Sequence, residues 1–161
     1  MSRLFAYLLS LLPILSLLSA QTTETDYDRY ILFHWKGALT SHSIQLKVFP
    51  QPAILAANYQ TAVVLFQKPI SAANINQVIT FTFTNVEYPV ETVDFSNLEY
   101  NTEYYYFFVF GSSLTLTNSD YATLYQSKTI QEFHFKTFGI ALKPYSFTFG
   151  AASCASSGSE S

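Results

Sequence analysis

Cys154, the only cysteine of the chain, is the side chain best suited to do chemistry. It lies in the C-terminal stretch FTFGAASCASSGSES, which runs from Phe147 to Ser161. A deprotonated cysteine is a nucleophile and a strong ligand for soft metal ions. Taken alone, the sequence leaves several states open for it: a disulfide with a cysteine outside this sequence, a free thiol, a metal ligand, or a small buried hydrophobic side chain.

The other residues that could bind a metal or transfer a proton are scattered. His34, His42 and His134 fall on expected strands or turns without the spacing of metal ligands, so we expect their side chains to be solvated. The serine-rich stretch Ser156–Ser161 has no accompanying base and no phosphate-binding glycine pattern, which favours a linker. The formal charge of −3 and the lack of a basic cluster exclude a nucleic-acid-binding module.

The first twenty residues have the pattern of a secretory signal peptide. Arg3 precedes an apolar run from Leu4 to Leu18, and small residues follow up to Ala20. The alternative is a membrane anchor, but this run has 15 residues and contains a proline, whereas a spanning helix needs about 20. We therefore predict a signal peptide over residues 1–20 and a secreted mature chain that begins near Gln21 and has no membrane span.

Beyond the signal peptide, the sequence has the composition and the periodicity of β-strands. Aromatic residues make up 17% of the chain, and aromatic side chains favour strands over helices. Apolar runs predict seven short strands, near residues 31–36, 43–48, 62–66, 79–84, 90–95, 103–110 and 133–135. We expect an all-β sandwich over residues 28–137. The alternation places Phe33 and Trp35 on the same side as Ile31, and we assign Trp35 a structural role.

The stretch LEYNTEY, from Leu98 to Tyr104, resembles the corner that precedes a late strand in fibronectin type III and immunoglobulin-like domains. In that corner a tyrosine hydroxyl binds back to the backbone of the crossing loop. We therefore expect Leu98, Thr102 and Tyr104 to be structural residues. A chance loop before an aromatic strand is the alternative, because Tyr100 stands where a proline is usual.

The strand that follows this corner is apolar on both faces. Tyr105, Phe107 and Val109 lie on the face opposite to the sandwich core, where a strand of this kind is normally polar. An uncovered aromatic face would be a surface for interaction or aggregation. We expect the long segment 111–131 to fold over it as a loop.

Three segments in this order resemble PhoD-like alkaline phosphatases. HWKGALTSHSIQLKV (His34–Val48) is similar to the start of their β-domain, and YNTEYYYFFVFG (Tyr100–Gly111) to a later tyrosine-rich strand. The third is the segment around Phe147, Phe149, Ser153 and Cys154, which is similar to the first strand of their metallophosphoesterase domain. The resemblance implies a linker over residues 138–144 and the start of a truncated catalytic domain over residues 145–161.

The resemblance also implies a function for the parent protein. It would be a secreted enzyme that hydrolyses phosphate mono- or diesters with iron and calcium, with Cys154 as a candidate ligand of the iron. The catalytic cluster of carboxylates and imidazoles is missing, since Glu160 is the one acidic residue of the C-terminal segment. We therefore expect this piece to be inactive and metal-free, and its β-domain to pack on the missing catalytic domain. The alternative is a non-enzymatic secreted binding or adhesion module that holds a partner or a glycan on its aromatic face.

Overall fold

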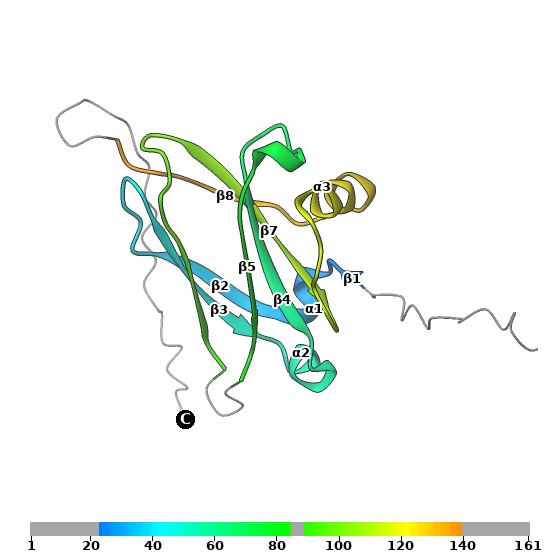
Figure 1. Cartoon of the computed structure of the whole chain (residues 1–161). Helices are drawn as coiled ribbons and strands as arrows, with labels where there is room; N and C mark the ends of the chain where they lie inside the picture. Colours follow the sequence, from blue (N-terminus) through cyan, green and yellow to red (C-terminus); the bar gives the residue numbers. More distant parts are fainter. Residues whose placement is uncertain (1–22, 85–88, 140–161) are drawn as a thin grey trace, which may run out of the picture.

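A computed structural model describes residues 23–84 and 89–139 of the chain. These residues form two antiparallel β-sheets that pack face to face, together with four short helical segments (Figure 1). The expected signal peptide, the expected catalytic strand and Cys154 lie outside the described residues. Of the expected linker, residues 138–144, only residues 138 and 139 are described.

The larger sheet has five strands. At its centre β4 (Gln60–Phe66) lies between β5 (Ile75–Thr82) and β7 (Glu103–Gly111). The other edge of β7 is shared by β8 (Phe133–Lys136) and by the two-residue β1 (Thr23–Glu24). All of these pairings are antiparallel.

The smaller sheet has three strands in the order β2 (Ile31–Gly37), β3 (Ile44–Pro50) and β6 (Glu91–Phe95). All seven expected strands are therefore present, and the all-β sandwich is confirmed. The first, second and fifth of these strands form one sheet, and the remaining four form the other. The folded unit starts before residue 28, because Tyr27 is buried in the core.

The main core fills the space between the two sheets. The smaller sheet contributes alternate apolar residues, such as Leu46, Val48 and Val93, which are completely buried. The larger sheet contributes every second side chain of β7, namely Tyr104, Tyr106, Phe108 and Phe110. Fully burying one such aromatic side chain is worth about 1.5–3 kcal/mol, so this row is a main source of the stability of the sandwich.

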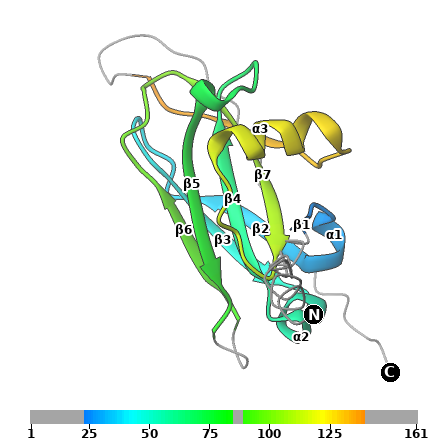
Figure 2. The same ribbon diagram turned by 45° about the vertical axis from the view of Figure 1, so that its right-hand side comes forward.

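A second core lies on the opposite face of the larger sheet, under helix α3 (Asn118–Ser127). Figures 1 and 2 show α3 lying across β4 and β7 on the side away from the smaller sheet. Phe107, Val109 and Tyr121 are at most 1% exposed there. The expectation that the segment 111–131 covers this face is confirmed, but the covering element is a helix rather than a loop.

A capping box starts α3 at Thr117. The Thr117 side chain accepts a hydrogen bond from the backbone N–H of Asp120, and the Asp120 carboxylate accepts one from the backbone N–H of Thr117, 2.8 Å away. These bonds satisfy amide groups that have no partner inside the helix. The segment therefore becomes helical at the point where it crosses the apolar face of β7.

The corner before β7 has the geometry that its sequence suggests. The hydroxyl oxygen of Tyr104 accepts a hydrogen bond from the backbone N–H of Glu99 at 2.9 Å. Leu98 is buried beside it, and the Thr102 hydroxyl donates to the carbonyl oxygen of Tyr100 at 3.0 Å. These contacts fix the loop that connects the two sheets at the start of β7.

Replacing Tyr104 by phenylalanine should lower the free energy of unfolding by about 1 kcal/mol, because one internal hydrogen bond is lost while the ring stays packed. Urea denaturation measures the change. Tyr100→Phe is the matched control, since the Tyr100 side chain is 47% exposed and we expect its loss of a hydroxyl to have little effect. Equal stability of the two variants would mean that the hydrogen bond of Tyr104 does not hold the corner.

The expected orientation of Phe33 and Trp35 is wrong. The pairing of β2 with β3 shifts by one residue between Ile31 and Phe33, and such a bulge reverses the faces of all later side chains. Ile31 therefore points into the core, whereas Phe33 and Trp35 point out from the sandwich and are 43% and 57% exposed. Trp35 is a surface residue, not part of the core, and His34 takes the inward position.

Candidate functional site

A histidine between two tyrosines forms a cluster of titratable groups between the two sheets. His34, on β2, lies between Tyr27 of α1 (Tyr27–Tyr30) and Tyr106 of β7. The Nδ1 atom of His34 is 2.6 Å from the Tyr27 hydroxyl, and its Nε2 atom is 2.7 Å from the Tyr106 hydroxyl. A neutral imidazole donates one of these bonds and accepts the other. The expectation that the His34 side chain is solvated is therefore wrong. His34 links the two sheets through its bond to Tyr106.

All three groups of this cluster are neutral at pH 7, and burial shifts the pKa of each one further from 7. Burial lowers the pKa of His34 to about 4, and the nearby charge of Lys36 adds to that shift. Burial raises the pKa of Tyr27 to about 12, with a contribution from Asp28, and it also raises the pKa of Tyr106 strongly. Both ring nitrogens of His34 are hydrogen-bonded within the fold, so the cluster ties β2 to α1 and to β7.

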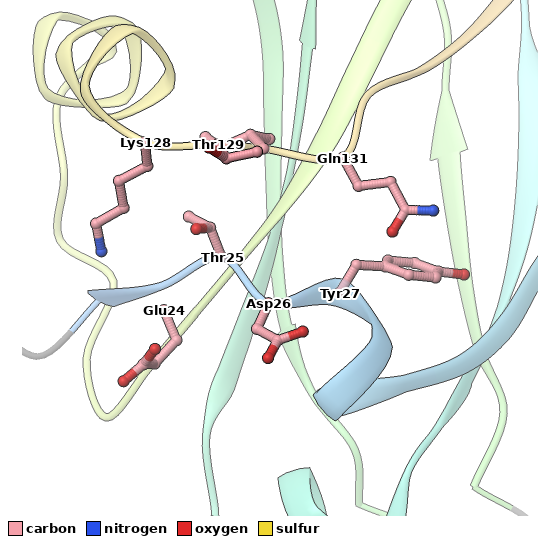
Figure 3. Close-up of a pocket in the computed structure, with 8 residues that line it drawn as sticks. Glu24, Thr25, Asp26, Tyr27, Lys128, Thr129 and Gln131 are labelled. Carbon is pink, nitrogen blue, oxygen red and sulfur yellow. The ribbon is translucent and has the colours of Figure 1, made fainter.

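An open groove lies beside this cluster, between the N-terminal segment and the segment that follows α3. Its volume is about 600 Å³. Figure 3 shows its two walls, which are formed by residues 24–27 and residues 128–131. Its charged side chains are Glu24, Asp26 and Lys128.

Two of these charged groups already have partners in the fold. Asp26 accepts a hydrogen bond from the backbone N–H of Arg29 at 3.2 Å and so caps α1, and Lys128 donates to the backbone carbonyl of Thr23 at 2.9 Å. The groove lining contains no histidine or cysteine that could act as a base or a nucleophile.

The third feature is an exposed aromatic patch, formed by Phe33, Trp35 and Phe49 on the outer face of the smaller sheet. The Phe33 and Phe49 rings stack with 4.2 Å between centroids and 20° between planes, and the Trp35 ring lies 6.0 Å from Phe49. No described helix covers this face of the sheet, which Figure 1 shows on the side opposite to α3. Exposed aromatic clusters on a sheet are typical of binding surfaces.

The structure brings together three of the residues singled out from the sequence. Leu98, Thr102 and Tyr104 meet at the corner before β7, and Trp35 lies apart from them on the aromatic patch. Residues 23–84 and 89–139 contain no group of three or more histidine, cysteine or acidic side chains that could hold a metal ion. The iron and calcium that the resemblance implies would therefore need ligands from other parts of the protein.

The aromatic patch was missed from the sequence because its exposure depends on the bulge in β2. Alternation alone predicts that the aromatic side of this strand faces the core. The sequence held one weak sign that the orientation was open. Large side chains occur on both sides of the strand, with Phe33 and Trp35 on one side and His34 and Lys36 on the other. Only the register with β3 decides between them.

Among the described residues, no helix has the length and the apolar composition that crossing a membrane requires. No protein-family model matches the chain, and no curated protein matches its sequence. Two solved structures are similar in fold. One is a computationally redesigned β-sandwich protein, with 13% identity, a TM-score of 0.45, and coverage of 73% of this chain and 97% of that one. The other is the sensor domain of the anti-sigma factor RsgI4 from Pseudobacteroides cellulosolvens, with 12% identity, a TM-score of 0.39, and coverage of 76% and 99%.

Proposed function

We propose that the chain is the N-terminal part of a secreted PhoD-like metallophosphoesterase and that its sandwich is the accessory domain before the catalytic domain. The observation that carries this proposal is that the described residues form a two-sheet sandwich with β8 as its last strand. Among the described residues, the buried members of both cores extend no further than Phe135, and the PhoD-like segment from Phe147 to Cys154 follows them in the chain. This order of parts is the one that the resemblance implies.

The point where the chain leaves the sandwich is held rigidly, which suits a domain that orients a following one. The Thr137 hydroxyl donates to the backbone carbonyl of Glu99 at 2.6 Å and accepts from the backbone N–H of Thr102 at 2.9 Å. One residue later, the Phe138 N–H donates to the Thr40 carbonyl at 3.1 Å. The exit is thus tied both to the tyrosine corner and to the β2–β3 turn. A second domain attached here would start from a fixed position.

In this proposal the sandwich itself performs no chemistry. Cys154 would be a ligand of the iron, and the bound metal ions would activate the attacking oxygen and neutralise the phosphate charge. The carboxylates and imidazoles that complete such a centre would come from residues beyond Ser161. The substrate would be a phosphate mono- or diester.

The alternative, a binding module, would use the second aromatic face of β7 as its binding surface. The aromatic face of β7 that includes Phe107 and Val109 is buried under α3 and cannot hold a partner in this fold. A binding role would need a different surface, such as the aromatic patch on the smaller sheet.

The test is the hydrolysis of p-nitrophenyl phosphate and bis(p-nitrophenyl) phosphate by two chains, with iron and calcium present. One is the 161-residue chain, and the other continues with the residues that follow Ser161 in the native transcript. We expect metal-dependent hydrolysis by the longer chain only, and Cys154→Ser should reduce it to the level of the short chain. Ser153→Ala is the control, because it changes a neighbouring residue but removes no metal ligand. A stop codon directly after Ser161, or a longer chain without metal-dependent hydrolysis, would contradict the proposal.

A further inference from the structure

We propose that the aromatic patch is a saccharide-binding surface, on which Trp35 stacks against the apolar face of a β-linked hexose ring. This role is separate from phosphate-ester hydrolysis and does not depend on it. It follows from the orientation of the Trp35 ring, from the polar side chains beside it and from the size of the patch.

The Trp35 ring lies over Gly37 on its own strand. A Cβ atom at Gly37 would be 3.5 Å from Nε1 and 3.8 Å from Cδ1 of the indole, so the ring rests against the strand with no side chain in between. The Nε1–Cδ1 edge of the indole therefore lies close to Gly37, while 57% of the side chain is exposed. The Phe49 ring, which stacks on Phe33, lies 6.0 Å from the Trp35 ring. The ring is thus ordered before any ligand arrives, which lowers the entropic cost of binding.

Polar side chains border the rings on the same outer face. Lys47 pairs across the strands with Trp35 and donates to the Thr92 hydroxyl at 2.6 Å. Gln45 pairs with Gly37 and donates to the Asp94 carboxylate at 2.9 Å. The border therefore offers both donors and acceptors, with one positive and one negative charge. A fatty acyl chain could form no hydrogen bond with these groups, whereas the hydroxyl groups of a sugar can.

A hexose matches this arrangement because its two kinds of surface are separated. The axial C–H groups of a β-linked ring form an apolar face that can lie flat on an indole, and the equatorial hydroxyl groups project from the edge of the ring. On this sheet the aromatic rings would contact the face, and Lys47, Gln45 and Asp94 would reach the edge. An extended β-linked chain can also lie along the exposed rings better than a helical α-linked chain can.

The size of the patch favours a sugar over a second copy of the chain. A large aromatic side chain has about 150–250 Å² of surface, so the exposed fractions of Phe33 and Trp35 leave roughly 200 Å² for contact. A stable protein interface buries about 800 Å² on each partner. The patch is therefore too small to hold a dimer by itself, but it is large enough for one or two sugar rings.

Because Trp35 is the only tryptophan of the chain, its fluorescence reports directly on the patch. The experiment is a titration of the 161-residue chain with cellohexaose, chitohexaose and maltohexaose, followed by tryptophan emission and by isothermal titration calorimetry. We expect a saturable change with cellohexaose or chitohexaose and none with maltohexaose. Trp35→Ala should abolish the calorimetric signal, and Phe33→Ala should weaken binding about five- to tenfold. Tyr100→Ala, which removes an exposed aromatic side chain away from the patch, should leave binding unchanged.

Three results would overturn the proposal. The first is the absence of saturable binding to both β-linked sugars. The second is binding that Trp35→Ala does not change although the variant unfolds at the same urea concentration as the parent chain. The third is a dimer in sedimentation that dissociates in Trp35→Ala, which would assign the patch to contact between two copies. Because none of these measurements involves hydrolysis, they leave the proposed phosphatase role untouched.

Discussion

Replacing Tyr121 by alanine is expected to lower the free energy of unfolding by about 3–5 kcal/mol, the usual cost of removing a large aromatic side chain from a core. Tyr121 is 1% exposed and lies between α3 and the larger sheet, where it packs with Phe107 and Val109. Its removal leaves a cavity and loosens the helix that covers the second aromatic face. Urea denaturation followed by circular dichroism measures the loss.

A control substitution on the same helix shows whether the loss of stability comes from lost packing or from a change in helix propensity. Gln126 is exposed on α3, so we expect Gln126→Ala to change the stability by less than about 0.5 kcal/mol. We also expect Tyr121→Ala, but not Gln126→Ala, to bind the dye ANS, because the apolar face of β7 becomes accessible. Equal stability of the two variants would mean that α3 does not protect this face.

The second large effect is a loss of stability in acid that depends on His34. The pKa of His34 is lowered by burial from 6.5 to about 4 in the folded chain. Between these two values the unfolded chain binds more protons than the folded one, so the stability is complete above pH 6.5 and decreases as the pH falls towards 4. One pKa unit corresponds to about 1.4 kcal/mol, and after allowance for the partial exposure of the ring we expect a loss of about 2 kcal/mol.

The measurement is the free energy of unfolding at several values between pH 7 and pH 4, for the parent chain and for two variants. In His34→Gln, an amide replaces the imidazole and can still donate to one tyrosine and accept from the other, but it does not titrate. We expect this variant to be less stable at pH 7 and to lose less stability on acidification. His134→Gln removes an exposed histidine and should keep the acid dependence of the parent. An unchanged slope in His34→Gln would assign the acid effect to other groups.

The strands could be predicted because their signal is local. Alternating apolar residues along β3 and β6 place one row on the core, and a continuous apolar run such as Ala62–Phe66 requires cover on both faces. The two apolar faces of β7 predicted that another segment must cover the sheet. The tyrosine corner could also be anticipated, since Tyr104 and Glu99 are five residues apart.

Helix α3 was missed because its apolar pattern is weak. Its two buried residues, Tyr121 and Ala122, are adjacent, and they give little of the periodic contrast by which a helix is found in a sequence. The spacing of Thr117 and Asp120 did carry a capping signal that could have marked its start. Packing against the apolar face of β7 supplies the stability that the helix does not derive from its own sequence.

The sequence alone determined the fold class, the positions of the strands and the need for a cover over β7, because each follows from side-chain alternation within a few residues. The tertiary structure decided which side of β2 faces solvent, since a bulge of one residue in its pairing with β3 reverses every later side chain. That reversal exposes Trp35 and turns His34 inward. The second tyrosine partner of His34, Tyr106, is 72 residues away, so no local pattern could reveal their contact. Both proposed roles of these residues, in saccharide binding and in acid-dependent stability, therefore depend on the pairing of distant strands.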